Sequence, residues 1–139
     1  MKVGVVGTED KNLSKSRDAG ARLQKIIRRN RSSEAVGVYA VCSAHPQVIV
    51  AAAREAHENG SVLPVESTSS QVNQFGGYTE QNPEQFAGFV CAQARDAGLS
   101  ANRVLLGGDH LGPFPWRREP ASVAMDKARA LVRACVLAG

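Results

Sequence analysis

The sequence has no apolar run of about 18 residues, the length that a transmembrane helix requires. Its opening residues, MKVGVVG, form too short an apolar run for a signal peptide. Cysteine is scarce, and Cys42, Cys91 and Cys135 form no C-x-x-C pair, which argues against a zinc ribbon or a redox motif. These absences predict a cytoplasmic protein that has no membrane partner.

Aromatic residues make up only 5% of the chain. None of them interrupts the basic run RLQKIIRRNR at residues 22–31, although single-stranded nucleic acid is bound by stacking bases on aromatic rings. Within this run Leu23, Ile26 and Ile27 have the i, i+3, i+4 spacing of an amphipathic helix. A phosphate or nucleic-acid patch is the alternative, but we interpret the basic side chains as a solvated helix face and predict no nucleic-acid partner.

A dinucleotide-binding fingerprint is also missing, because the glycines of MKVGVVG do not continue as G-x-G-x-x-G. A nucleotide-binding α/β module therefore rests on this heptapeptide alone. The following stretch, DKNLSKSRDAG, is polar, so residues 1–20 are predicted to be an appended or flexible segment. Residues 21–139 form the predicted domain, and the 43% apolar content is ordinary for a globular fold.

What the sequence does contain is an alternation of strand and helix patterns. Apolar runs at 35–43, 61–67 and 103–106 have strand length and are continuous rather than alternating, as in sheets covered on both faces. Helices are predicted from Pro46 to Gly60, from the cap Asn82 to Gly98, and from about residue 120. This order indicates an α/β fold with parallel strands.

In parallel α/β folds the loops that follow the carboxyl ends of the strands form the functional site. Here those loops read CSAHP, ESTSSQVNQFGGYT and GGDHLGPFPW, whereas the opposite connections are short polar turns. This asymmetry predicts a small-molecule site at one end of the sheet. Its candidate residues are Ser43, His45, Glu66, Gln71, Asn73, Gln74, Gly107, Gly108, Asp109 and His110.

Each candidate has a functional and a structural interpretation. His45 binds a ligand or caps the helix that begins at Pro46, and Glu66 binds a ligand or makes a cap or ion pair. The amides of Gln71, Asn73 and Gln74 suit sugar hydroxyls but also satisfy the backbone of a long loop. Gly107 and Gly108 leave room for a ligand to approach closely.

Among the candidates, Asp109 and His110 have the most specific chemical roles. An aspartate transfers protons to and from hydroxyls, and an imidazole binds divalent metals. The alternative is an aspartate that caps the loop beside a histidine bonded to the backbone. One histidine and one aspartate do not complete a zinc site, which takes about three protein ligands.

Three stretches, VCSAHP, TSSQVNQFGGYT and GGDHLGP, in this order and spacing, resemble the GatZ/KbaZ family over residues 22–139. These are the subunits of class II D-tagatose-1,6-bisphosphate aldolase usually described as non-catalytic. The resemblance implies a TIM-type (β/α)8 barrel and a role in galactitol, tagatose or N-acetylgalactosamine catabolism. It implies a sugar phosphate as ligand and the catalytic class II aldolase subunit as partner. Relatives that resemble metal-dependent ketose or ketose-phosphate 4-epimerases supply the alternative function.

By position, the resemblance assigns Asp109 as the proton-transferring residue and His110 as the ligand of a Zn²⁺ or Mn²⁺ ion. Glu66 matches the family's glutamate, and Asn73 and Gln74 match its amide pair. The sequence departs from the family pattern at Ser67, at Ser70 and at FPW (114–116), and the last change alters a loop near the site.

A (β/α)8 barrel takes about 250 residues, so the 139 residues are predicted to form about the first three βα units. The chain is then an N-terminal fragment, the product of an early stop, or one that pairs with other chains, and we expect it to form oligomers. Two hypotheses result: an accessory subunit that is not independently catalytic, and a metal-dependent sugar-phosphate enzyme.

Overall fold

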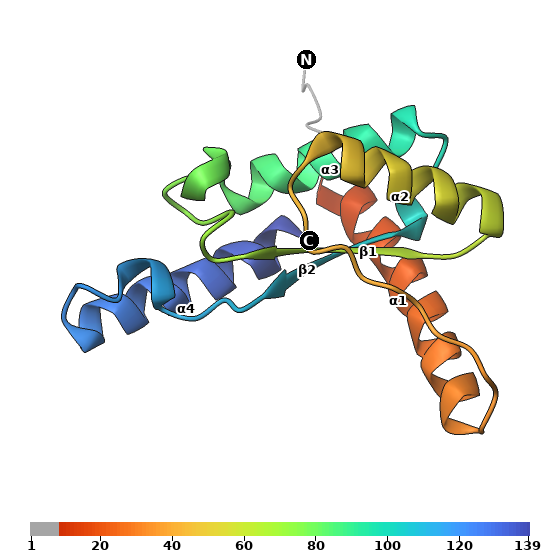
Figure 1. Ribbon diagram of the computed structural model, residues 1–139, viewed down its shortest axis with the longest axis horizontal. Coiled ribbons are helices and arrows are strands. Elements are labelled where there is room, and N and C mark those ends of the chain that lie inside the picture. Colours follow the sequence, from red (N-terminus) through yellow and green to blue (C-terminus); the bar gives the residue numbers. More distant parts are fainter. Residues whose placement is uncertain (1–8) are drawn as a thin grey trace, which may run out of the picture.

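The computed structural model describes residues 9–139 (Figure 1). Three short 3-10 turns and four longer helices surround a two-stranded sheet. The elements run in the order α1 (Glu9–Arg31), α2 (Pro46–Asn59), β1 (Leu63–Thr68), η1 (Gly77–Thr79), α3 (Pro83–Asp96), η2 (Ala101–Arg103), β2 (Val104–Asp109), η3 (Phe114–Trp116) and α4 (Ala121–Ala138).

The helix α1 includes the basic run and begins earlier than the sequence suggests. Residues 9–20, which were expected to be flexible, are helical, and Ala19 is fully buried. The prediction for residues 1–8, including the heptapeptide MKVGVVG, lies outside the described residues. The helix extends away from the sheet (Figure 1), and Ile27 near its end stays exposed.

The two strands pair in parallel, with a register that runs from Leu63 opposite Val104 to Thr68 opposite Asp109. This pairing confirms an α/β fold with parallel strands. The strand β2 also extends through Gly107, Gly108 and Asp109, which the sequence analysis had assigned to the following loop. The strand therefore carries Asp109 at its carboxyl end.

The first predicted strand, residues 35–43, is not formed as a strand. It contributes one parallel bridge, Val41 to Val65, through hydrogen bonds from Val41 N to Pro64 O and from Glu66 N to Val41 O. The next donor of β1 on this side would be the nitrogen of residue 64, and proline has no N–H. Pro64 therefore stops the ladder from continuing back toward residue 39.

The helix boundaries follow the predicted caps. His45 Nδ1 accepts a hydrogen bond from Gln47 N at the start of α2, and Gly60 ends this helix in the left-handed conformation (φ +76°). Asn82 and Gln85 form a capping box at the start of α3. The helix α4 begins after Pro120, as predicted.

The main core lies on one face of the sheet, where α2 and α3 pack (Figure 1). It takes alternate residues of each strand, Leu63 and Val65 from β1 and Val104 from β2. A second cluster joins Trp116 to the buried side of α4. None of the helices in residues 9–139 combines the length and apolar character needed to cross a membrane.

Candidate functional site

Two carboxylates lie on the sheet face opposite the core. In the parallel register Glu66 is opposite Gly107, and Asp109 is opposite Thr68 two residues further along. Successive side chains of a strand alternate between its faces, so Glu66 and Asp109 project from the same side. A Cβ at position 107 would lie 3.2 Å from Glu66 Cγ. The absence of a side chain at Gly107 therefore leaves space for the side chain of Glu66.

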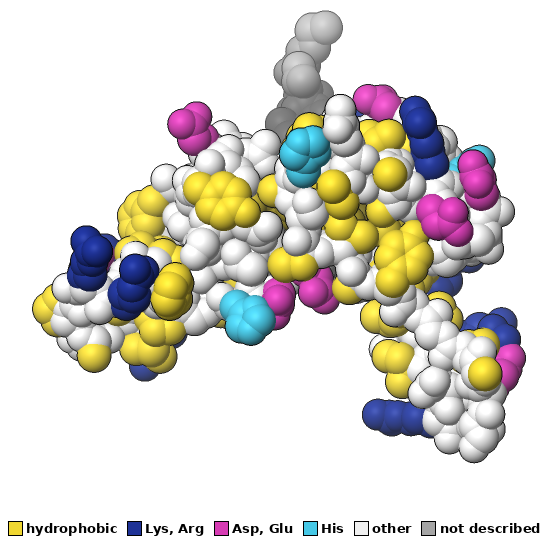
Figure 2. All heavy atoms as spheres, viewed as in Figure 1, with side chains coloured by type: hydrophobic (Ala, Val, Ile, Leu, Met, Phe, Trp, Pro, Cys, Tyr) yellow, Lys and Arg dark blue, Asp and Glu magenta, His cyan; other side chains and the backbone are white. Residues whose placement is uncertain are grey.

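Asp109 is joined to the histidine that follows it. The distance between His110 Nδ1 and Asp109 Oδ2 is 2.9 Å, and the imidazole is 84% exposed. His110 adopts a left-handed backbone (φ +50°), and its carbonyl accepts a hydrogen bond from the buried Ser69 Oγ at 3.0 Å. A non-glycine residue in this region is uncommon, and the bond from Ser69 holds the backbone of this turn. Figure 2 shows a histidine beside acidic side chains on the lower side of the molecule.

Cys42 approaches the same cluster from the segment before α2. Its Sγ lies 4.0 Å from Asp109 Oδ2 and 4.0 Å from Gln71 Oε1. Partial burial raises the pKa of the Cys42 thiol above its usual value, and the nearby carboxylates of Asp109 and Glu66 raise it further. Sequence reasoning did not assign Cys42 to the site. The available signal is its position directly after Val41, which faces the core, so Cys42 projects from the opposite face.

The loop after β1 is held by its own amides. Gln71 Oε1 accepts a hydrogen bond from Thr68 N at 2.8 Å, and Asn73 is buried, donating to Ser69 O and accepting from Phe75 N. Gln74 Nε2 instead donates to Lys127 O on α4 at 3.0 Å. Only Gln71 of the three predicted amides is thus placed beside the carboxylate cluster.

Three other candidates, Ser43, His45 and Gly108, take part in hydrogen bonds or packing within the chain. Ser43 Oγ accepts a hydrogen bond from His45 N, and His45 in turn caps α2. Gly108 faces the other side of the sheet, and a Cβ there would clash with the side chain of Leu111. The space at Gly108 is therefore occupied by the chain itself. Roles of these residues in binding a sugar phosphate stay predictions.

The residues present do not assemble a metal site. In the part of the chain that the structure describes, no three His, Cys, Asp or Glu side chains are arranged so that they can hold an ion. A zinc site takes about three protein ligands, and His110 supplies one nitrogen. The Zn²⁺ or Mn²⁺ ion stays a prediction.

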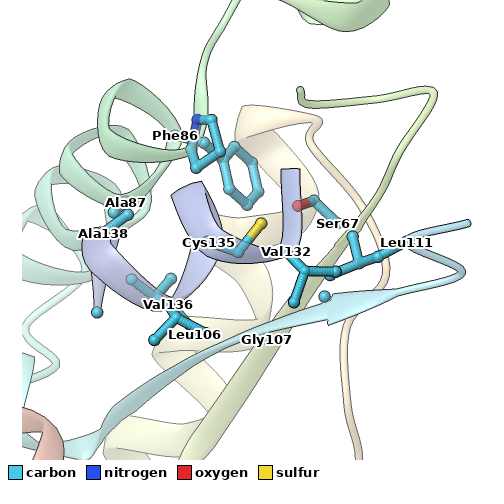
Figure 3. A pocket seen from close by; sticks show the side chains of 13 residues that line it. Ser67, Phe86, Ala87, Leu106, Gly107, Leu111, Val132, Cys135, Val136 and Ala138 are labelled. Carbon is cyan, nitrogen blue, oxygen red and sulfur yellow. The ribbon is translucent and has the colours of Figure 1, made fainter. Parts of the chain in front are cut away.

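An apolar cavity of about 230 Å³ lies between β2, α3 and α4. Figure 3 shows the side chains of Phe86, Leu106, Val132 and Cys135 around it. Leu106 belongs to the core face of β2, so this cavity opens on the helix side and is separate from the carboxylates. It offers no charged group to a sugar phosphate.

Exposed aromatic rings gather on the two loops at the carboxyl ends of the strands. Phe75 and Tyr78 follow β1 and Phe114 follows β2, and each is more than 60% exposed. Phe75 contacts the ring edge of Trp116 at a centroid distance of 6.1 Å, and the Arg117 guanidinium lies 4.4 Å from the centre of the Phe114 ring. We call Phe75, Tyr78, Phe114 and Arg117 the aromatic rim. Sequence reasoning missed it, although the three rings are visible in the quoted loops.

The cluster of Cys42, Glu66, Gln71, Asp109 and His110 has the groups that acid–base chemistry on a hydroxyl requires. A carboxylate with a hydrogen-bonded imidazole accepts and returns a proton. The amide oxygen of Gln71 and the thiol of Cys42 add polar contacts on one side. No feature of the described residues favours a 4-epimerase over an aldolase subunit.

The family model and the similar curated proteins carry nearly the same description. Residues 23–139 match the sequence model of a family described as "D-tagatose-1,6-bisphosphate aldolase subunit GatZ/KbaZ-like". The chain is 52% identical over 118 residues to the D-tagatose-1,6-bisphosphate aldolase subunit GatZ of Klebsiella pneumoniae subsp. pneumoniae, covering 84% of this chain and 28% of the relative. It is 47% identical over 117 residues to the subunit of the same name from Salmonella agona, covering 84% of this chain and 28% of that relative.

A solved structure is also similar, a crystal structure of a probable tagatose 6 phosphate kinase from Sinorhizobium meliloti 1021. It superposes with a TM-score of 0.71 and 48% sequence identity over 74% of this chain and 27% of that chain. The chain thus spans little more than a quarter of the length of the relatives it matches.

Proposed function

Because this chain belongs to the family of GatZ/KbaZ-like D-tagatose-1,6-bisphosphate aldolase subunits, we propose that it acts as part of such a subunit and supports a catalytic partner subunit. The single observation that carries the proposal beyond family membership is the polar cluster at the carboxyl ends of two parallel strands. A sugar phosphate is the substrate class, and the cytoplasm is the compartment. Part of a (β/α)8 barrel is the proposed architecture, supported by the parallel register and by the helix that follows each strand.

The accessory role is favoured over independent catalysis by the state of the site residues. Ser43, His45 and Asn73 are engaged in capping and loop bonds. Gln74 is likewise bonded to the backbone of α4, so fewer of the candidate side chains are free to act on a substrate.

The aromatic rim is the surface proposed to contact the catalytic subunit. Phe, Tyr, Trp and Arg are enriched at protein interfaces and supply most hot spots. The rim combines three exposed rings with Arg117, whose guanidinium has no carboxylate partner among the described ion pairs. An apolar patch edged by acidic side chains on the partner would complement it.

The test mixes this chain with a catalytic class II tagatose-bisphosphate aldolase subunit and measures cleavage of tagatose 1,6-bisphosphate and the thermal lifetime of the activity. We expect binding together with a longer lifetime or faster turnover. Asp109→Asn and Glu66→Gln should leave the stimulation intact, because the partner performs the chemistry. Loss of stimulation in both variants would assign catalysis to this chain instead, and failure of the wild-type chain to bind would refute the accessory role.

The role of the aromatic rim in binding the partner is tested by comparing two double variants. Tyr78→Ser combined with Phe114→Ser removes exposed apolar area at the rim, and Val136→Ser combined with Leu137→Ser removes similarly exposed area at the end of α4. We expect the rim pair alone to weaken binding, by about tenfold or more, as hot-spot losses do. Equal weakening by the two pairs would contradict a specific rim.

A further inference from the structure

The basic run of α1 lines a groove rather than projecting only into solvent. A cavity of about 610 Å³ lies between α1 and the turn that joins α2 to β1, with Val36 and Gly37 between them. The helix contributes one stripe of side chains, spaced by three or four residues along its length. These are Asp18, Ala21, Arg22, Lys25, Ile26 and Arg29. The facing wall consists of Asn59, Gly60, Ser61 and Val62.

Positive charge exceeds negative charge in the groove. Arg29 is bonded to Glu34, through Nε to Oε2 at 2.7 Å and through a second contact, so that charge is balanced. The carboxylate of Asp18 also lines the groove and offsets one positive charge, although its printed hydrogen bond is from Asn102 Nδ2 at 3.1 Å. Neither Arg22 nor Lys25 has a carboxylate within an ion-pair distance among the residues whose side chains are described. Their charges therefore attract an anion into the cavity.

An unpartnered hydroxyl on the facing wall is the second, independent observation. Ser61 Oγ is buried and has no hydrogen-bond partner, although buried polar atoms are nearly always bonded. The backbone of the same residue is satisfied, since Ser61 N donates to Asn59 Oδ1 and Ser61 O accepts from Arg103 Nε. The hydroxyl alone lacks a partner, and a rotation about the Cα–Cβ bond of Ser61 would turn it toward a ligand oxygen in the groove.

The end of α2 would ordinarily repel an anion, because the carboxyl terminus of a helix carries partial negative charge. Arg103 offsets this effect here. Its guanidinium donates to Ala56 O and Ser61 O, the carbonyls at this end of the helix. Arg103 thereby places a positive charge against these carbonyls and reduces the repulsion of an anion at this end of α2.

We propose that this groove is a second binding site, which takes a phosphate group through Arg22, Lys25 and Ser61. Arginine and lysine both bind phosphate oxygens strongly. The groove lies at the start of β1, one strand length of about 20 Å from the carboxylates at its other end. It is independent of the proposed aldolase-subunit role, which rests on the opposite end of the sheet. The ligand is inorganic phosphate or the phosphate of a small monoester, and the volume of the cavity admits either.

The experiment titrates the full chain with inorganic phosphate and, separately, with glycerol 3-phosphate, at constant ionic strength. Binding is followed by the NMR amide shifts of Gly60 and Ser61. The test variant combines Arg22→Gln with Lys25→Gln. The matched control combines Arg28→Gln with Arg31→Gln, which removes the same charge from the same exposed helix at positions outside the groove. Ser61→Ala tests the hydroxyl separately.

We expect saturable shifts, an apparent Kd weakened by about tenfold in the groove variant, and little change in the control. The tighter of the two probes identifies the source of the phosphate. Shifts that fail to saturate, or equal weakening in both variants, would overturn the proposal, because either result describes an unspecific charge effect. Unchanged binding in Ser61→Ala would remove the hydroxyl from the site, and with it the observation that distinguishes this groove from a charged surface.

Discussion

The pKa of the Cys42 thiol depends on its partial burial and on the nearby carboxylates of the candidate site. Its Sγ lies between the Asp109 carboxylate and the Gln71 amide, on the face that carries Glu66. Partial burial raises the pKa of the thiol, and both carboxylates add to the rise. The folded chain therefore keeps the proton to a higher pH than the unfolded chain does. The contribution to folding stability is fully present below the ordinary thiol pKa of 9.0 and declines as the pH rises above it.

Alkylation of Cys42 by iodoacetamide, followed by peptide mass spectrometry across a pH series, measures this pKa because only the thiolate reacts. The midpoint of the Cys42 profile should lie above that of the same residue in the unfolded chain. Asp109→Asn should move the midpoint down, since it removes a neighbouring negative charge. Asp126→Asn, on an exposed residue paired with Arg129, is the control. A midpoint at or below the unfolded value would show that the carboxylates do not face the thiol.

At the residue scale the sequence predicted only part of the site. Asp109 and His110 are neighbours along the chain, so their proximity is evident from the sequence. The approach of Cys42 to Asp109 joins residues 67 positions apart, and nothing local indicates it. The contact at Gly108 is also absent from the sequence analysis, because the space that this glycine leaves is filled by the side chain of Leu111.

At the scale of elements, helices were predicted better than strands. The capping residues Asn82 and Gly60 act within one turn of the chain, so that α2 ends at Gly60 and α3 begins after Asn82. Strand pairing depends on distant partners. The segment 35–43 has strand composition but forms one bridge because Pro64, on another element, lacks the donor it needs. Glycines suggested a loop after residue 106, whereas pairing with β1 extends β2 to Asp109.

The capping box of α3 gives a quantitative prediction. Asn82 Oδ1 accepts a hydrogen bond from Gln85 N, and Gln85 Oε1 accepts one from Asn82 N, each at 2.9 Å. Asn82→Ala should lower the free energy of unfolding by about 1 kcal/mol, measured by urea denaturation. Ser100→Ala is the matched control, because Ser100 also precedes a helical turn but makes no side-chain cap bond. A control loss as large as that of Asn82→Ala would show that the capping bonds do not stabilise α3.

At the scale of the molecule, the sheet is small and its surroundings are open. Among residues 9–139 it has two full strands, and an unpaired parallel edge tends to recruit further strands. Exposed apolar side chains add to this tendency on α4, where Val136 and Leu137 are each at least 75% exposed. These two features support the oligomer expected from the sequence, which stays a prediction.

We expect the isolated chain to associate with itself, and light scattering should show an average mass that rises with protein concentration. The double variant Val136→Ser and Leu137→Ser should reduce the association, because it removes exposed apolar surface from α4. A monodisperse monomer that unfolds cooperatively in calorimetry would contradict the expectation. It would also show that the two strands and four helices form a self-sufficient core.

The pairing of Glu66 with Gly107 across the sheet has an evolutionary consequence. A side chain acquired at position 107 would press against the glutamate stem, which must then shift by a few tenths of an ångström. The effect of a substitution at either position therefore depends on the residue at the other, and we expect the two positions to vary together among related chains.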